Sequence, residues 1–297
     1  MGHASALDDF ARLRRLVEQA GLLNRQPFYY VCQGLCVLSL LALSVMVLLV
    51  ADNFWLQCLN AVFLAFISAQ IGLLGHDAGH RQILRTPTQN DALGLLCGNL
   101  LLGISRHWWS AKHNRHHRYP NPPGIDPDVS HAAVAATAEQ ARRQPTLLQF
   151  MASHGQCFVI PLLLLQAIAV PASRGRGAQD RRQRGLRAFR ARHPHWCGIP
   201  LLVLQALGVH LDSVRSLSRE RTGRGAVEMV LIGIHLLVSL SVLVAVLGLS
   251  EALVFVLIRQ SLFGLYTGSI FAPNHKGMRM IERRDAVDFL RRQVLTA

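Results

Sequence analysis

Histidines at helical spacing form two clusters in this 297-residue chain. The stretch GHDAGH contains His76 and His80, and the stretch HNRHH contains His113, His116 and His117. Residues three or four positions apart share one face of an α-helix, so each cluster predicts imidazoles on one helix face. A neutral imidazole offers a nitrogen lone pair and suits iron, copper and zinc. Five imidazoles exceed what a single zinc ion needs, so the pattern favours a pair of metal ions.

Long apolar segments indicate which elements carry these clusters. Hydrophobic residues make up 51% of the sequence, which is typical of a polytopic membrane protein. Segments 31–51 and 54–74 each approach the roughly 20 residues that cross a bilayer, and two more follow at 227–248 and 252–271. A short link joins the two members of each pair. We therefore expect an all-α membrane protein with four transmembrane helices in two hairpins, and a cytosolic or interfacial helical region that carries the histidines.

The distribution of basic residues orients the predicted hairpins. The chain has 31 Lys and Arg against 17 Asp and Glu, and neither hairpin link contains a Lys or Arg. Positive residues stay cytosolic, so we expect a multi-pass protein of the cell membrane with both termini and region 75–226 in the cytosol. Both clusters and His275, which follows the fourth span, can then meet at one membrane face. This placement argues against a nucleic-acid partner and for contact with membrane lipid.

The cysteines and carboxylates of the sequence indicate which kind of metal site is expected. The six cysteines form no CxxC pair, so the sequence indicates neither a thiolate metal site nor a disulfide framework. Carboxylates near the clusters are candidates for orienting the imidazoles through hydrogen bonds, and these are Asp77, Asp126 and Asp128. The favoured alternative for Asp126 and Asp128 is that they shape the turn in NPPGIDPD. A metal transporter fits less well, because transporters place ligands within the spans, where this chain has only His235.

Four stretches, GHDAGHR, WWSAKHNRHHRYPN, GIDPD and FAPNHKGM, resemble the membrane-bound fatty acid desaturases. The resemblance covers about residues 50–297 and is strongest to the bacterial acyl-lipid or acyl-CoA type, as found in actinobacteria. It implies a non-haem centre of two iron ions that introduces a C=C bond into a long fatty acyl chain, using O2 and two electrons. The ligands implied by position are His76, His80, His113, His116, His117 and His275.

The resemblance also implies partners. The substrate would be a fatty acyl lipid or acyl-CoA. Because no haem-binding segment or Cys-rich iron–sulfur motif is fused to the chain, we expect a separate electron donor, either a ferredoxin-like protein or a flavoprotein reductase. A lipid hydroxylase of the same superfamily remains an alternative, since its metal site and oxidant are alike.

Two features depart from the family pattern. A third histidine box should follow His275 by some tens of residues, whereas residues 276–297 contain no histidine. We therefore expect a chain that is truncated before the third box, and a non-catalytic pseudoenzyme is a further alternative.

The second departure is an internal repeat. Residues 147–170 resemble residues 186–209, and both copies contain the sequence IPLL. A tandem duplication between the second box and the third span accounts for it, and both copies are expected to be interfacial or re-entrant helices. The expected organisation is thus a cytosolic segment, 1–30, followed by a desaturase-like membrane domain, 31–297.

Overall fold

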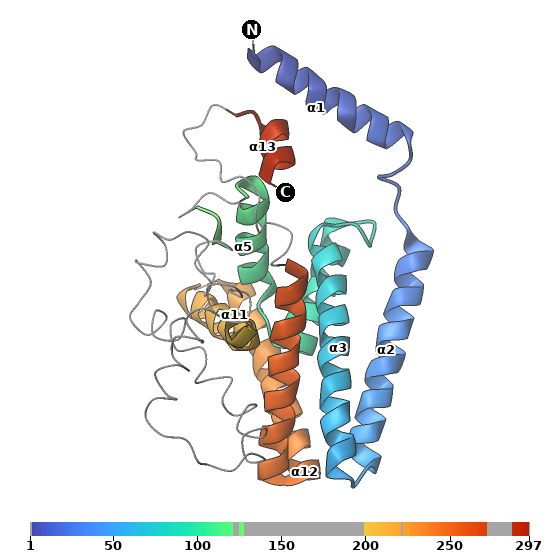
Figure 1. Ribbon diagram of the computed structural model, residues 1–297, viewed down its shortest axis with the longest axis vertical. Helices are drawn as coiled ribbons and strands as arrows, with labels where there is room; N and C mark the ends of the chain where they lie inside the picture. Colours follow the sequence, from blue (N-terminus) through green and yellow to red (C-terminus); the bar gives the residue numbers. More distant parts are fainter. Residues whose placement is uncertain (1, 121–124, 128–198, 221, 272–286, 297) are drawn as a thin grey trace, which may run out of the picture.

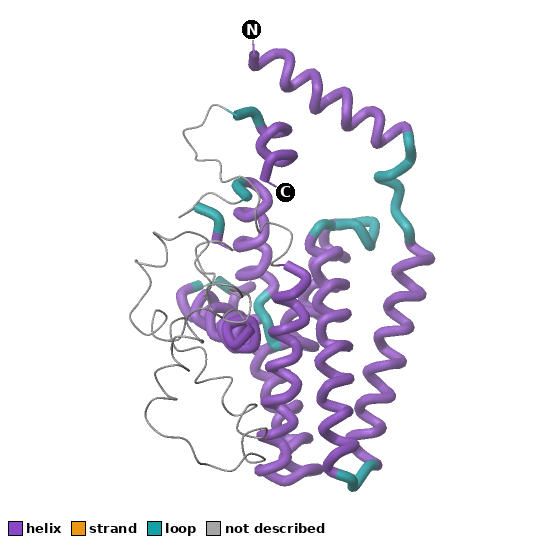
Figure 2. The backbone as a smooth tube through the Cα atoms, viewed as in Figure 1, coloured by secondary structure: helices purple, strands orange, loops and turns teal. Residues whose placement is uncertain are grey.

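The computed structural model describes residues 2–120, 125–127, 199–220, 222–271 and 287–296. Within these ranges the chain consists of helices and loops, without strands, which confirms the all-α prediction (Figure 2). In chain order the elements are α1 (Gly2–Gln19), α2 (Pro27–Val50), α3 (Phe54–Gly79), α4 (Pro87–Leu95), η1 (Leu96–Leu102), α5 (Arg106–Arg118), α11 (Ile199–Arg219), α12 (Gly223–Phe271) and α13 (Phe289–Thr296).

Three helices are long and apolar enough to cross a membrane, namely α2, α3 and residues 223–268 of α12. The chain in α12 turns back at Gly248, where φ is 74° and ψ is 165°. Only glycine adopts such angles readily, because it has no Cβ. The chain therefore reverses direction within α12, whose second limb lies beside α3 (Figure 1), and the four predicted apolar segments are present as two hairpins. The second turn differs slightly from the expectation, since residues 249–251 are helical.

Polar side chains hold the first hairpin together at its link. Asn53 caps α3 by accepting a hydrogen bond from the Leu56 amide at 3.0 Å. Gln57 donates from Nε2 to main-chain carbonyls at the end of α2 and in the link. Farther along the hairpin, the buried hydroxyl of Ser44 donates to Asn60 Oδ1 at 2.7 Å. The contacts of Gln57, Ser44 and Asn60 satisfy buried polar groups that water reaches poorly.

A segment that we did not expect from the sequence connects the two histidine clusters. Thr86 and Gln89 form a capping box at the start of α4, and the chain then continues into the π-helix η1. Gly103, with φ 69°, ends η1 and lets the chain turn into α5. Because η1 packs against both α3 and α12, this segment fixes where α5 begins.

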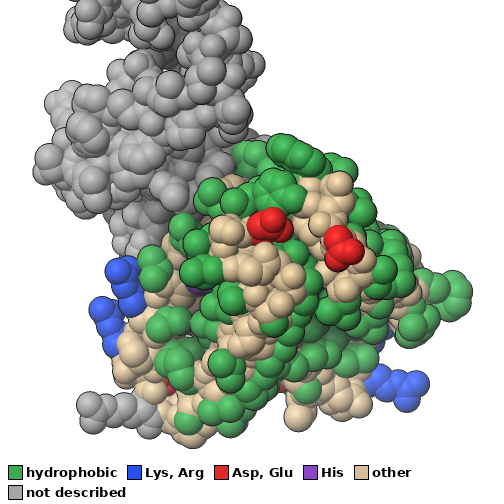
Figure 3. All heavy atoms as spheres, turned by 90° about the horizontal axis from the view of Figure 1, so that it is seen from below, with side chains coloured by type: hydrophobic (Ala, Val, Ile, Leu, Met, Phe, Trp, Pro, Cys, Tyr) green, Lys and Arg blue, Asp and Glu red, His purple; other side chains and the backbone are tan. Residues whose placement is uncertain are grey.

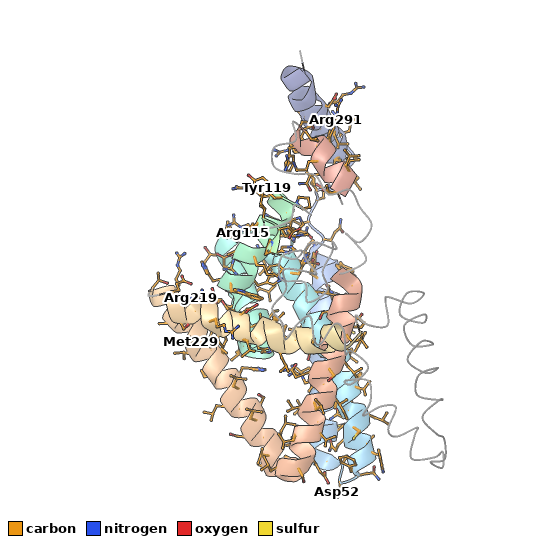
Figure 4. All side chains as sticks on the ribbon, turned by 60° about the vertical axis from the view of Figure 1, so that its left-hand side comes forward. Asp52, Arg115, Tyr119, Arg219, Met229 and Arg291 are labelled. Carbon is orange, nitrogen blue, oxygen red and sulfur yellow. The ribbon has the colours of Figure 1, made fainter. Side chains whose placement is uncertain are left out.

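The two ends of the bundle differ in character. Both termini lie at the end that carries α5 (Figure 1), and the labelled Arg115, Tyr119 and Arg291 lie at that end in Figure 4, opposite Asp52. Seen from the opposite end, the surface is a mixture of hydrophobic and uncharged groups with acidic side chains among them, and basic side chains lie only toward the rim (Figure 3). This asymmetry matches the charge pattern of the sequence.

The helix α11 runs across the bundle rather than along it (Figure 4). Its residues 199–209 are the described part of the second repeat copy. The rest of that copy, and all of the copy at 147–170, lie outside the described residues. The interfacial placement of the repeat therefore stays a prediction.

Candidate metal centre

The two histidine clusters lie together at the end of the molecule that carries both termini. His76 is in the last turn of α3, and His80 is the residue that ends this helix. They face α5, and four imidazoles each offer a nitrogen such that all four atoms lie within 4.8 Å of one another: His76, His80, His113 and His117. The structure thus brings two separate stretches of sequence to one place, as expected.

His113 lies at the centre of this group. Its Nε2 atom is 2.9 Å from Nε2 of His80 and 2.9 Å from Nε2 of His117. A ring nitrogen carries either one proton or one lone pair, so His113 Nε2 can form a hydrogen bond with only one of these two neighbours at a time. Burial, followed by the neighbouring histidines, lowers the pKa of His113 to about 2, and burial also lowers the pKa of His80. Both imidazoles are therefore neutral near pH 7, which is the form that binds metals.

An aromatic ring fixes the position of His113. Trp109, one helical turn earlier in α5, stacks on the His113 ring with centroids 4.4 Å apart and planes at 20°. The same indole lies 5.5 Å from the His76 ring on α3. A Cβ at Gly79 would lie 2.6 Å from the Trp109 ring, so a residue without a side chain is needed where the two helices meet.

Carboxylates bind the second nitrogen of two histidines. His76 donates from Nδ1 to Asp77 at 3.1 Å, and Tyr30 of α2 donates to the other Asp77 oxygen at 3.2 Å. His116 donates from Nδ1 to Asp126, whose oxygens lie at 2.9 and 3.0 Å. Asp126 is 0% exposed, which makes this a buried pair. Asp126 is thus placed to orient an imidazole, a role that stays a prediction alongside turn shaping, and Asp128 lies outside the described residues.

His116 differs from the other histidines of its cluster. Its ring centroid is 5.6 Å from that of His117 and 6.3 Å from that of His113, and it is not one of the four converging imidazoles. Adjacent helical residues point about 100° apart, so His116 and His117 cannot share one direction. The expectation of a single face for all three residues is too simple in this respect. His275 lies outside the described residues, and its place in the site stays a prediction.

Some neighbours of the site escaped the sequence reasoning. Trp109 has a local signal, because it lies four positions before His113. Gln293 of α13 donates to the His117 carbonyl at 3.0 Å, and the Arg292 guanidinium lies 6.0 Å from the Tyr119 ring centroid. These tail residues are distant in sequence, so no spacing rule could have found them.

Comparisons with known proteins bear on the meaning of this geometry. The sequence model of a family described as "Fatty acid desaturase" matches residues 53–296. A delta(8)-fatty-acid desaturase of Helianthus annuus is 35% identical over 133 residues, which are 44% of this chain and 29% of that protein. Fatty acid desaturase 3 of Bos taurus is 32% identical over 169 residues, which are 54% of this chain and 38% of that protein.

A delta(6)-fatty-acid desaturase of Caenorhabditis elegans is 32% identical over 135 residues, with 44% of this chain and 28% of that protein covered. The chain thus spans well under half the length of these curated relatives. No solved structure matches the chain. Because these relatives come from a plant and from animals, the bacterial type stays a prediction.

Proposed function

We propose that this chain, which belongs to the fatty acid desaturase family, introduces a double bond into a long fatty acyl chain at a histidine-bound iron site. The convergence of imidazoles from α3 and α5, with ring nitrogens within 4.8 Å of one another, carries the proposal. Three helices that can span a membrane would bring the site close to acyl chains. The proposed substrate is a fatty acyl lipid or acyl-CoA.

The donor set fits iron. All four converging groups are imidazoles, a ligand that iron accepts, and the pKa of His113 is low enough to keep that ring neutral. A bound ion would take the place of a proton on each coordinating nitrogen, because a ligand must offer a lone pair to the metal. We propose two iron ions, with Asp77, Asp126 and Asp128 orienting ligands from outside and the following residues as ligands: His76, His80, His113, His116, His117 and His275.

The proposed reaction balances with a separate reductant. Iron, when bound, would supply the oxidising power that removal of hydrogen from an unactivated methylene demands, which no side chain has. The acyl chain loses two hydrogen atoms and gains a C=C bond, and O2 takes up these atoms together with two electrons and two protons to give two molecules of water. A ferredoxin-like protein or a flavoprotein reductase would supply the two electrons.

The residues of this chain would hold and shield the site. The stacked Trp109 keeps the His113 ring in one orientation and covers one face of it. The pairs His76–Asp77 and His116–Asp126 fix which nitrogen of each ring carries the proton and which one faces away from the carboxylate. Preorganised rings bind an ion without a large loss of side-chain entropy.

We also propose a topology. The chain would cross the cell membrane several times, with the histidine end and both termini on the cytosolic side. The position of both termini at the end that carries α5 supports this (Figure 1), as does the scarcity of basic side chains on the opposite end (Figure 3).

The test is turnover by the purified chain in lipid nanodiscs, with iron, O2 and reduced ferredoxin, followed by mass spectrometry of the acyl chains. We expect a saturated acyl chain to lose two mass units. His113→Ala should lower the rate by about a hundredfold or more, since it removes the central imidazole. His107→Ala, a histidine of the same helix outside the cluster, should leave the rate near that of the wild type.

Other products would overturn the proposal in distinguishable ways. A gain of one oxygen atom would identify a hydroxylase. A chain that binds well under one iron ion and converts no acyl donor would be a pseudoenzyme.

A further inference from the structure

The start of α5 is held by side chains from other parts of the chain. The first amides of an α-helix have no acceptor within that helix, so buried ones need outside partners. Each amide from residue 105 to residue 108 has one. The Ser105 amide donates to the Ser213 hydroxyl of α11, and the Arg106 amide donates to Asn99 Oδ1 of η1 at 3.1 Å. The His107 amide donates to both carboxylate oxygens of Glu228 in α12, at 3.2 and 3.3 Å. The Trp108 amide donates to Ser105 Oγ at 3.1 Å.

Glu228 organises two of the other acceptors. Its Oε2 atom accepts from Asn99 Nδ2 at 3.0 Å, which turns the Asn99 carbonyl oxygen toward the Arg106 amide. It also accepts from the Ser105 hydroxyl at 2.5 Å, which leaves the Ser105 lone pairs for the Trp108 amide. One carboxylate thus determines the partners of three consecutive amides.

The environment explains why a carboxylate can lie there. Glu228 is 4% exposed and lies near the start of α12, where the third predicted span begins. A buried carboxylate is costly unless donors surround it, and the positive end of the α5 dipole adds a favourable field. Figure 4 shows the end of α11 and the start of α12, near the labelled Arg219 and Met229, beside the lower part of α5.

Two main-chain carbonyl groups at the end of η1, just before α5, also contact histidines that are distant in sequence. His235 of α12 donates from Nδ1 to the Leu100 carbonyl at 2.9 Å. His210 of α11 has its Nε2 atom 3.0 Å from the Leu102 carbonyl. These carbonyls belong to the last turn of η1, where intrahelical donors run out. The residues between η1 and α5 are therefore fixed on both sides by α11 and α12.

We propose that Glu228 is a positioning residue of the metal centre, acting through the N-terminus of α5. This helix carries His113, His116 and His117, and its start determines its axial rotation and hence where these rings point. The expected effect on metal binding rests on the proposed function, because a displaced α5 weakens binding only if its histidines hold the metal. Its structural premise, that Glu228 holds residues 105–108, stands separately.

The experiment uses the full chain in nanodiscs with two readouts. Amide hydrogen exchange at residues 105–108 reports the anchoring, and titration with Co²⁺, followed by visible absorption, reports the site. Glu228→Ala should speed exchange at residues 106–108 about tenfold or more, because the His107 amide loses its acceptor and the acceptors of Arg106 and Trp108 lose the contact that orients them. It should raise the Co²⁺ dissociation constant about ten- to a hundredfold, with altered absorption bands. Glu228→Gln, which keeps one acceptor oxygen, should give smaller changes of the same kind.

The controls separate the two claims. Glu251→Gln, beside the turn of α12 at Gly248, should change neither readout. His117→Ala should weaken Co²⁺ binding without changing exchange at residues 105–108. Faster exchange in Glu228→Ala with unchanged Co²⁺ affinity and bands would overturn the positioning role, and so would unchanged exchange. If the wild type binds no Co²⁺, the proposed function fails and the positioning role fails with it, whereas the exchange result still decides the anchoring.

Discussion

The two histidine-bearing helices are fixed in space by different means. His76 and His80 occupy the end of α3, a helix of 26 residues whose other end is tied to α2 by a capped link. The second cluster occupies α5, a helix of 13 residues. The position of the first cluster follows from one long helix, whereas α5 depends on contacts from η1, α11 and α12 at its start.

The supporting carboxylates show the same contrast. Asp77 is adjacent in sequence to its partner His76, and its side chain is 31% exposed. Asp126 is ten residues from His116 and completely buried. The comparison teaches that the first half of the site is built into a single helix, while the second half is assembled from several segments. Substitutions should therefore damage the second half more.

The largest expected effect comes from the buried carboxylate. Asp126→Asn should raise the iron dissociation constant about ten- to a hundredfold, since outer partners of ligands typically contribute this much. Asp77→Asn should cost less, because water can replace an exposed partner. Chelator competition on the two variants measures the difference, with Asp52→Asn at the opposite end as control. Equal effects of Asp77→Asn and Asp126→Asn would remove the distinction between the two halves.

A smaller effect is expected where the two halves touch. Gly79→Ala places a Cβ 2.6 Å from the Trp109 ring, so α3 and α5 must separate or the indole must move. The unfolding free energy should fall by about 1–3 kcal/mol, as for other overpacked sites. Gly72→Ala in the same helix makes only an ordinary contact, at 3.7 Å, and should be neutral or stabilising. Thermal unfolding of both variants provides the measurement. If Gly72→Ala loses as much stability as Gly79→Ala, the loss comes from replacing a glycine in α3 and not from the contact with Trp109.

The smallest effect is a pH dependence that both halves share. Burial lowers the pKa of His113 from 6.5 to about 2 and lowers that of His80, so the unfolded chain binds protons that the folded chain does not. The metal-free protein should therefore lose stability as pH falls below 6.5, with no contribution from these groups above it. Unfolding curves between pH 5 and 8, compared with His113→Asn, test this. The same dependence of unfolding free energy on pH in the wild type and in the variant would contradict this prediction.

The sequence predicts those parts of the molecule that depend on local patterns. The apolar segments predict the hairpins, and the spacing of His76 and His80 places them together at the end of one helix. The segment that holds α5 is different, because residues 96–102 form a π-helix too short to be read as a span. Glu228 acts on His107 across 121 positions of the chain, so no spacing rule predicts the contact. Asp126 was found by proximity to the cluster, but only the fold decides that it faces His116.

The most direct test of the central claim is iron K-edge X-ray absorption on the iron-loaded chain and on His113→Ala. If imidazoles from α3 and α5 bind the metal together, the wild type shows the outer-shell scattering of several imidazole rings, and the variant shows clearly less. Iron held by oxygen ligands alone, with the same spectrum in both proteins, would contradict the account.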